Sequence, residues 1–173
     1  NEGQAILISY PSEARRVKIF PRQQSSFSIA RNSTFQVKVR NTGDKNPDPK
    51  DTFNLQTQIS DPDWTVMLYA ANGYTPLINH DSDPLPDTGE ILPGETFTVT
   101  VRVSAPLGVD PGETVTVTLT ASSSKNAAAQ DQAIMVSAVP AAFAHTYRNA
   151  SQGIPGGVHI DLINPAFRLD TLV

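Results

Sequence analysis

The chain has 173 residues, of which 39% are hydrophobic and 17% are charged, and its net charge is −4. These values suit one domain of ordinary size and argue against intrinsic disorder, while the acidic balance argues against nucleic acid as a partner. Because the chain has no cysteine, a disulfide framework, a cysteine zinc site and a thiol nucleophile are excluded. No apolar run reaches the roughly 20 residues that a transmembrane helix needs, so no membrane span is predicted.

Apolar and polar residues alternate along most of the chain, which is typical of strands with one buried face. In chain order, the predicted strands are residues 6–10, 17–20, 35–39, 53–59, 64–69, 97–103, 115–119 and 134–138. Clusters of Pro, Gly, Asn and Asp separate them, and no segment keeps a helical period over three turns. This pattern predicts an all-β, antiparallel β-sandwich of about seven to nine strands over residues 4–139.

Residues 140–173 differ in composition from this sandwich. A glycine-rich stretch at residues 153–157 is followed by an alternating segment at residues 158–163, which predicts a linker and a further strand. That strand could pair with the sandwich, begin a following domain or pair with another chain. We expect a monomer unless this tail strand swaps. Because the sequence begins without Met or a signal peptide, we interpret it as an excised piece of a longer protein or a processed product.

Three short motifs carry a resemblance to a known family. Residues 35–43 read FQVKVRNTG, residues 63–66 read DWTV, and residues 92–96 read LPGET. Their order resembles the Ig-like domain found beside α-galactosidase and NPCBM modules and repeated in large prokaryotic surface proteins. The resemblance covers roughly residues 30–139. It implies an Ig-like (fibronectin/CARDB-like) sandwich with a non-catalytic spacer or adhesive role at the cell surface or outside the cell, beside neighbouring domains of the same chain.

An acidic stretch at residues 79–90, NHDSDPLPDTGE, has the ligand spacing of a calcium loop. The predicted ligands are the Leu85 carbonyl and five side chains: Asn79, Asp81, Asp83, Asp87 and Glu90. Pro84 stands where the loop of an EF-hand needs glycine, and no helices flank the stretch, so an EF-hand is excluded. Two interpretations stay open: a sandwich loop that binds calcium through some of these oxygens, and an acidic turn stiffened by proline. A second acidic group, comprising Asp44, Asp48 and Asp51, could lend a ligand or could be a polar connection.

Aromatic residues give an alternative function. Tyr69 and Tyr74 lie near an Asn-Gly turn and are candidates for a sugar-binding platform, whereas Trp64 is predicted to lie in the core. The chain would then be a carbohydrate-binding accessory module of a glycoside hydrolase, stabilised by calcium, with polysaccharide as its ligand. No catalytic residues and no further cofactor are predicted, because the sequence has no nucleophile elbow, zinc-protease motif or phosphate-binding loop.

Overall fold

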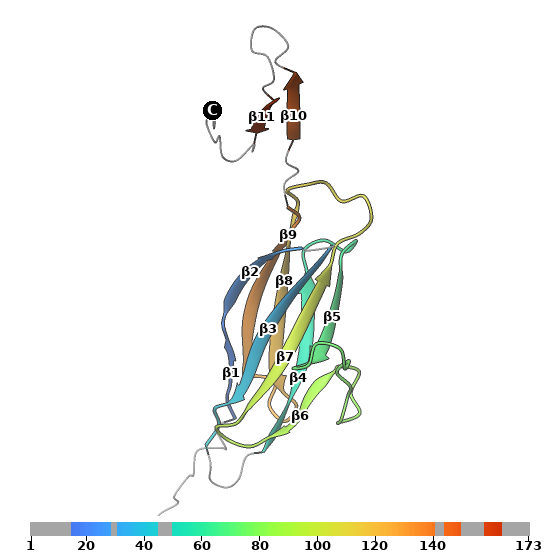
Figure 1. The fold of residues 1–173 in the computed structure, drawn as a ribbon. Helices are drawn as coiled ribbons and strands as arrows, with labels where there is room; N and C mark the ends of the chain where they lie inside the picture. Colours follow the sequence, from blue (N-terminus) through green and yellow to red (C-terminus); the bar gives the residue numbers. More distant parts are fainter. Residues whose placement is uncertain (1–14, 29–30, 45–49, 141–143, 150–157, 164–173) are drawn as a thin grey trace, which may run out of the picture.

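The computed structural model describes residues 15–28, 31–44, 50–140, 144–149 and 158–163 (Figure 1). The strands are β1 (Val17–Phe20), β2 (Gln23–Phe27), β3 (Asn32–Asn41), β4 (Asp51–Ile59), β5 (Thr65–Ala70), β6 (Asp87–Ile91), β7 (Thr96–Ser104), β8 (Thr114–Ser123), β9 (Gln130–Ala138), β10 (Ala144–Asn149) and β11 (Val158–Ile163). Within the described ranges there is no helix of the length and apolarity needed to cross a membrane.

Strands β1 to β9 form two sheets that pack face to face (Figure 1). One sheet has the strand order β1-β3-β7-β5, and the other has the order β2-β9-β8-β4-β6. If β1, β3, β4, β5, β7, β8 and β9 are lettered A to G, these orders contain the ABED and GFC sheets of an immunoglobulin domain. The prediction of an all-β, Ig-like sandwich of seven to nine strands is therefore confirmed.

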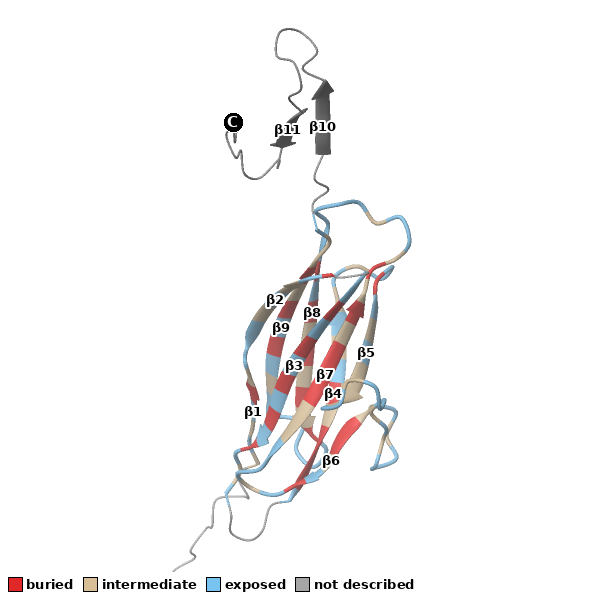
Figure 2. Cartoon of the chain, viewed as in Figure 1, coloured by how far each residue is buried: buried red, intermediate tan, exposed pale blue. Residues whose placement is uncertain are grey.

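The core lies between the two sheets and follows from strict alternation along the strands. In β3 and β8 every second residue is buried, and the residues between them face outward (Figure 2). Trp64, just before β5, is 3% exposed and belongs to this core, as its motif predicted. Each buried aliphatic side chain contributes about 1.5–3 kcal/mol relative to an exposed one, so this inner layer is the main source of stability.

The first strand of the sandwich is divided between the two sheets. β1 pairs antiparallel with β3, and after Pro21 the chain crosses so that β2 pairs parallel with β9. Asp131 on β9 holds the crossing, because its Oδ2 accepts the backbone N–H of Ile19 at 2.8 Å and its Oδ1 lies 2.8 Å from Arg22 Nη2. One segment of chain therefore fixes the edges of both sheets.

Two of the sequence motifs meet at Asn41, the last residue of β3. The buried Asn41 side chain donates from Nδ2 to the carbonyl of Ile91 at 2.9 Å and accepts the N–H of Gly43 at 2.9 Å. Its backbone N–H donates to Glu95 and its carbonyl accepts the N–H of Gly94, which has a φ of +88°. The Asn-Thr-Gly and Leu-Pro-Gly-Glu motifs therefore have a structural role, which is to join the end of β3 to the turn between β6 and β7.

Three strands were not predicted, namely β2, β6 and β10, and the parallel pairing of β2 with β9 differs from the antiparallel expectation. The sequence of β2 is QQSSF and that of β6 is DTGEI, so neither contains an apolar alternation. β6 also places Asp87 and Glu90 on a strand, whereas the sequence predicted a continuous loop from 79 to 90. The predicted strand at 6–10 lies outside the described residues.

The segment 158–163, predicted as a strand, forms β11. It pairs antiparallel with β10 in a two-stranded sheet of its own, with Tyr147 opposite Ile160. The domain division at residue 140 stays a prediction.

We predict that Asn41→Ala lowers the free energy of unfolding by about 2–3 kcal/mol, because it removes two hydrogen bonds and leaves the buried carbonyl of Ile91 without its donor. Urea unfolding followed by circular dichroism measures this change. Gln132→Ala is the control, since that exposed amide makes one bond, to Thr120, and its loss should cost less than about 0.5 kcal/mol. Equal losses for the two variants would contradict the role given to Asn41.

Candidate functional site

The acidic residues predicted to bind calcium lie in the connection between β5 and β6 and at the start of β6 (Figure 1). This connection is held to the sandwich by backbone hydrogen bonds at both ends. Leu77 donates to the carbonyl of Leu68 on β5, and the carbonyl of Pro86 accepts the N–H of Leu55 on β4. The acidic connection therefore closes one side of the sandwich, where an edge of each sheet ends.

Asp87 is the most buried carboxylate of the connection, with an exposed fraction of 0%. Its Oδ2 accepts the N–H of His80 at 2.5 Å, and its Oδ1 accepts the N–H of Gly89 at 2.6 Å. The Nδ1 atom of the half-exposed His80 ring also lies 2.6 Å from Oδ1. Burial raises the pKa of the Asp87 carboxyl, but these contacts with His80 and Gly89 lower it by more, so the pKa lies below the usual Asp value.

Asp83 and Asn79 fold the rest of the connection onto itself. Asp83 Oδ1 accepts the N–H of Leu85 at 2.7 Å and the Asn79 side-chain amide at 3.2 Å, and Asp83 Oδ2 accepts the side-chain amide of Asn54 on β4. Asn79 Oδ1 in turn accepts the N–H groups of Asp81 and Ser82, both at 2.8 Å. These are the side-chain-to-backbone bonds of Asx turns, which replace the regular ladder in an irregular connection.

The predicted calcium ligands are thus brought into one connection, but their oxygens already accept N–H groups of the protein. Glu90 is exposed and pairs with Thr52 on β4. Among the described residues, no group of three or more His, Asp or Glu side chains could hold a metal ion. In this arrangement the side chains do not form a ready calcium site, since they are not gathered as a group of three or more and the carboxylates of Asp83 and Asp87 hold the connection together. Calcium binding stays a prediction.

The second acidic group does not join the first one through any contact that the structure describes. Asp44 is exposed, Asp48 lies outside the described residues, and Asp51 is buried on β4. The carboxylate of Asp51 has an ion pair with Arg15, at 3.5 Å between Oδ2 and Nη1.

The two predicted sugar-binding tyrosines differ in how accessible their rings are. The Arg102 guanidinium lies 4.6 Å from the centre of the Tyr69 ring and also donates to the carbonyl of Gly73 at 2.8 Å. One face of Tyr69 is therefore covered by a cation–π contact. Tyr74 is 74% exposed at the turn after β5. Its role in binding sugar stays a prediction.

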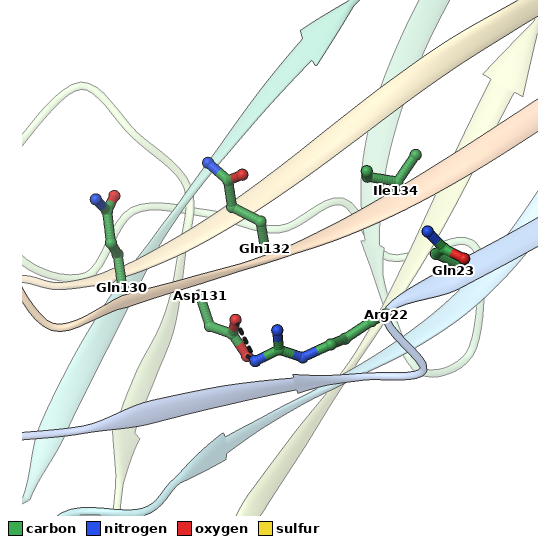
Figure 3. A pocket seen from close by; sticks show the side chains of 6 residues that line it. All are labelled: Arg22, Gln23, Gln130, Asp131, Gln132 and Ile134. Atoms are coloured by element: carbon green, nitrogen blue, oxygen red, sulfur yellow. Dashed lines mark hydrogen bonds and ion pairs between the residues drawn. The ribbon is translucent and has the colours of Figure 1, made fainter.

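A shallow depression that sequence reasoning missed lies on the outer side of the crossing between β1 and β2. Figure 3 shows the Arg22 and Asp131 side chains pointing toward each other beneath β9. Its lining is polar apart from one residue and consists of Arg22, Gln23, Gln130, Asp131, Gln132 and Ile134. The ion pair joins residues 109 positions apart, so no local spacing in the sequence could have revealed it.

No protein-family model matches the chain, and no curated protein matches it. Among solved structures, it is similar to a PapD-like (ASH) domain of human CEP192, with a TM-score of 0.43 and 9% identity over 82% of this chain and 96% of that one. It is also similar to a structure from the chaperone–tip adhesin complex of CFA/I fimbriae biogenesis, with a TM-score of 0.41 and 13% identity over 84% of this chain and 66% of that one. A family 123 glycoside hydrolase from Clostridium perfringens matches with a TM-score of 0.39 and 10% identity over 69% of this chain and 22% of that one. Similarity at this level is no basis for assigning a function.

We predict that Asp87→Asn flattens the dependence of stability on pH. Because the pKa of Asp87 is depressed in the folded state, its contribution is complete above the unfolded pKa of about 3.9. The contribution is lost as the pH falls through the lower folded pKa. Chemical unfolding at pH 6 and pH 3 should therefore show a smaller loss of stability in the variant than in the wild type. Asp63→Asn, on an exposed turn, is the control, and a wild-type pH dependence in Asp87→Asn would contradict the prediction.

Thermal unfolding in millimolar calcium and in EDTA tests the calcium prediction. An ion bound only by the folded chain adds about 2.7 kcal/mol at a hundredfold excess over its Kd, which raises the Tm by several degrees. The calcium prediction requires such a rise in the wild type and its loss in Asp81→Asn/Asp83→Asn. Coincident wild-type curves would mean that protein hydrogen bonds alone hold the connection.

Proposed function

We propose that the chain is a non-catalytic spacer or adhesive module of a secreted or cell-surface protein, of the Ig-like kind found beside α-galactosidase and NPCBM modules. One observation carries this proposal: the chain enters the sandwich at one end and leaves it at the other (Figure 1). Val17 pairs with Asn41 at the end of β3, whereas Ala138 at the end of β9 pairs with Phe27 at the end of β2. A module connected in this way adds its length to a linear array of domains.

When the two ends of the module are pulled apart, the force acts along the hydrogen-bonded strands β2 and β9. Hydrogen bonds loaded in this shear geometry resist force best. β2 is near the beginning of the sandwich in the sequence, and β9 is its last strand. The two strands pair in parallel, from Gln23 opposite Ile134 to Phe27 opposite Ala138. Tension between the two ends of the module pulls β2 and β9 in opposite directions along their length. The bonds between them must then break together, rather than one after another. At 3.2–3.4 Å per residue, residues 17–27 extend over about 35 Å between the end where the chain enters the sandwich and the end where it leaves.

Bonds between the two sheets reinforce this region. The hydroxyl groups of Ser33 on β3 and Ser137 on β9 are both buried and lie 2.6 Å apart, so a hydrogen bond connects the two layers. The side-chain amide of Gln24 on β2 donates to the carbonyl of Gln36 on β3 at 3.1 Å. Because β2 is bonded to both β9 and β3, separating it from one sheet also breaks a contact with the other.

The contacts of the histidine–carboxylate pair give Asp87 a structural role in the module. Both oxygens of Asp87 accept backbone N–H groups, and the side chain has no exposed surface. Asp87 therefore orients the connection between β5 and β6, and the half-exposed His80 ring lies against it at 2.6 Å between Nδ1 and Oδ1.

A carbohydrate-binding accessory module is the alternative, and the exposure of Tyr74 favours it. An exposed tyrosine ring can stack on a sugar. This alternative requires an uncharged polysaccharide to bind the wild type and not Tyr74→Ala.

We predict that Ser26→Pro lowers the force at which the module unfolds in single-molecule pulling, and that Ser25→Pro changes it much less. Backbone bonds from Ile134 to Arg22 and from Ser28 to Ala138 show that even-numbered residues from 22 to 28 face β9. Proline at 26 therefore removes a donor from the ladder, whereas proline at 25 removes an N–H group on the open edge. Equal forces for wild type and Ser26→Pro would contradict the mechanical role.

A further inference from the structure

The charged residues of the sandwich are distributed unevenly. Four cations form what we call the basic strip, on the outer face of β1 and β3 and just before β1: Arg16, Lys18, Lys38 and Arg40. All four are exposed, and none has an ion pair or side-chain hydrogen bond among the described residues. The neighbouring cations in the sequence behave differently, since Arg15 pairs with Asp51 and Arg22 pairs with Asp131.

The register places these unpaired charges close together. Lys18 lies directly opposite Arg40, and Lys38 lies two residues before Arg40 on the same face of β3. Opposite residues have Cβ atoms about 4.5–5.5 Å apart, and like charges at such positions destabilise a sheet. The strip therefore lowers the stability of the free protein, and an anionic ligand would relieve this repulsion.

The exposed residues beside the strip on β3 and β7 are uncharged and able to form hydrogen bonds. On β7, Thr96 lies opposite Arg40 and Thr98 lies opposite Lys38, and Gln36 continues the exposed face of β3. The nearest carboxylate along β7 is that of Glu95, whose Oε2 accepts the N–H of Leu92 at 3.3 Å in the preceding turn. Hydroxyl, amide and cationic groups are the donors that suit an acidic sugar chain.

We propose that the basic strip binds an anionic polysaccharide, one that carries carboxylate or sulfate groups. A docked protein would need an apolar centre, and stable anchoring to a membrane surface would need inserted apolar side chains or an acyl chain beside the cations. Single-stranded nucleic acid would need exposed aromatic rings for stacking. None of the large, exposed apolar side chains of the described residues belongs to β1, β3 or β7, although Met67 pairs with Arg102 on β7 and Leu92 lies in the turn before β7. The full set is Phe27, Met67, Tyr74, Ile78, Leu92, Leu107 and Ile134. The proposed polysaccharide site does not use the β2–β9 ladder that carries the proposed mechanical role. Either proposal can therefore be wrong without affecting the other.

Titration of the whole chain with heparin and with polygalacturonate tests this site, with uncharged dextran as the negative probe. The site variant is Lys38→Thr/Arg40→Thr, and the control variant is Arg31→Asn/Lys125→Thr, which changes exposed cations outside the strip. Each variant removes two positive charges from a chain of net charge −4, so both have the same net charge. Asn is chosen at 31 because Arg31 has a φ of +67°.

We expect the wild type to bind both anionic polymers but not dextran, and to bind more weakly as salt rises to 1 M, where the Debye length is about 3 Å. The Kd of the site variant should rise about tenfold, whereas that of the control should change less than about twofold. The Tm of the site variant should be at or above that of the wild type, because the repulsion between Lys18 and Arg40 is gone. If that variant is destabilised, Arg16→Ser/Lys18→Thr repeats the test on β1.

Three results would overturn the proposal. The first is no binding of either anionic polymer by the wild type. The second is an equal loss of binding in the site and control variants, which would reduce the effect to net charge. The third is binding to vesicles that contain phosphatidylserine without binding to the polysaccharides, which would assign the strip to a membrane surface.

Discussion

The hydrogen bonding of the first strand, divided between the two sheets, determines how this sandwich holds together. β1 completes the edge of one sheet and β2 completes the edge of the other, with a crossing at Pro21. The crossing leaves β1 without a ladder to β9, and Asp131 replaces it by accepting the N–H of Ile19 and pairing with Arg22. As a result, the two layers are joined by the covalent chain as well as by their apolar faces.

Buried polar side chains fix the connections around this frame. Asn41 joins the end of β3 to the turn before β7, and Asp87 joins the connection after β5 to the start of β6. Each satisfies backbone groups that irregular segments would otherwise leave without partners, which would cost about 1–3 kcal/mol per group. These two side chains therefore fix their connections to the sandwich, and this suits a module whose proposed function is to keep its length under tension.

The sequence predicted the elements whose signal is local and failed where the signal is not. Alternation identified β3, β7 and β8, because a strand with one buried face has an apolar residue at every second position. The DWTV motif placed Trp64 in the core. β2 and β6 were missed because they are polar edge strands, held by backbone bonds to residues far away in the sequence. The oxygens of residues 79–90 have the spacing of a metal loop, but the same spacing serves Asx turns, and only the fold shows that N–H donors occupy them. The pairing of Arg22 with Asp131 left no local signal at all.

The divided first strand is part of the global fold and not a loosely attached edge. Native-state hydrogen exchange tests it at the N–H groups of Ile19, Ser28 and Ile134, which bond Asp131, Ala138 and Arg22. We expect these amides to exchange only through global unfolding, with the same free energy as amides of β8 in the centre of the sheet. Exchange of these three amides by local opening, orders of magnitude faster than that of β8, would contradict it.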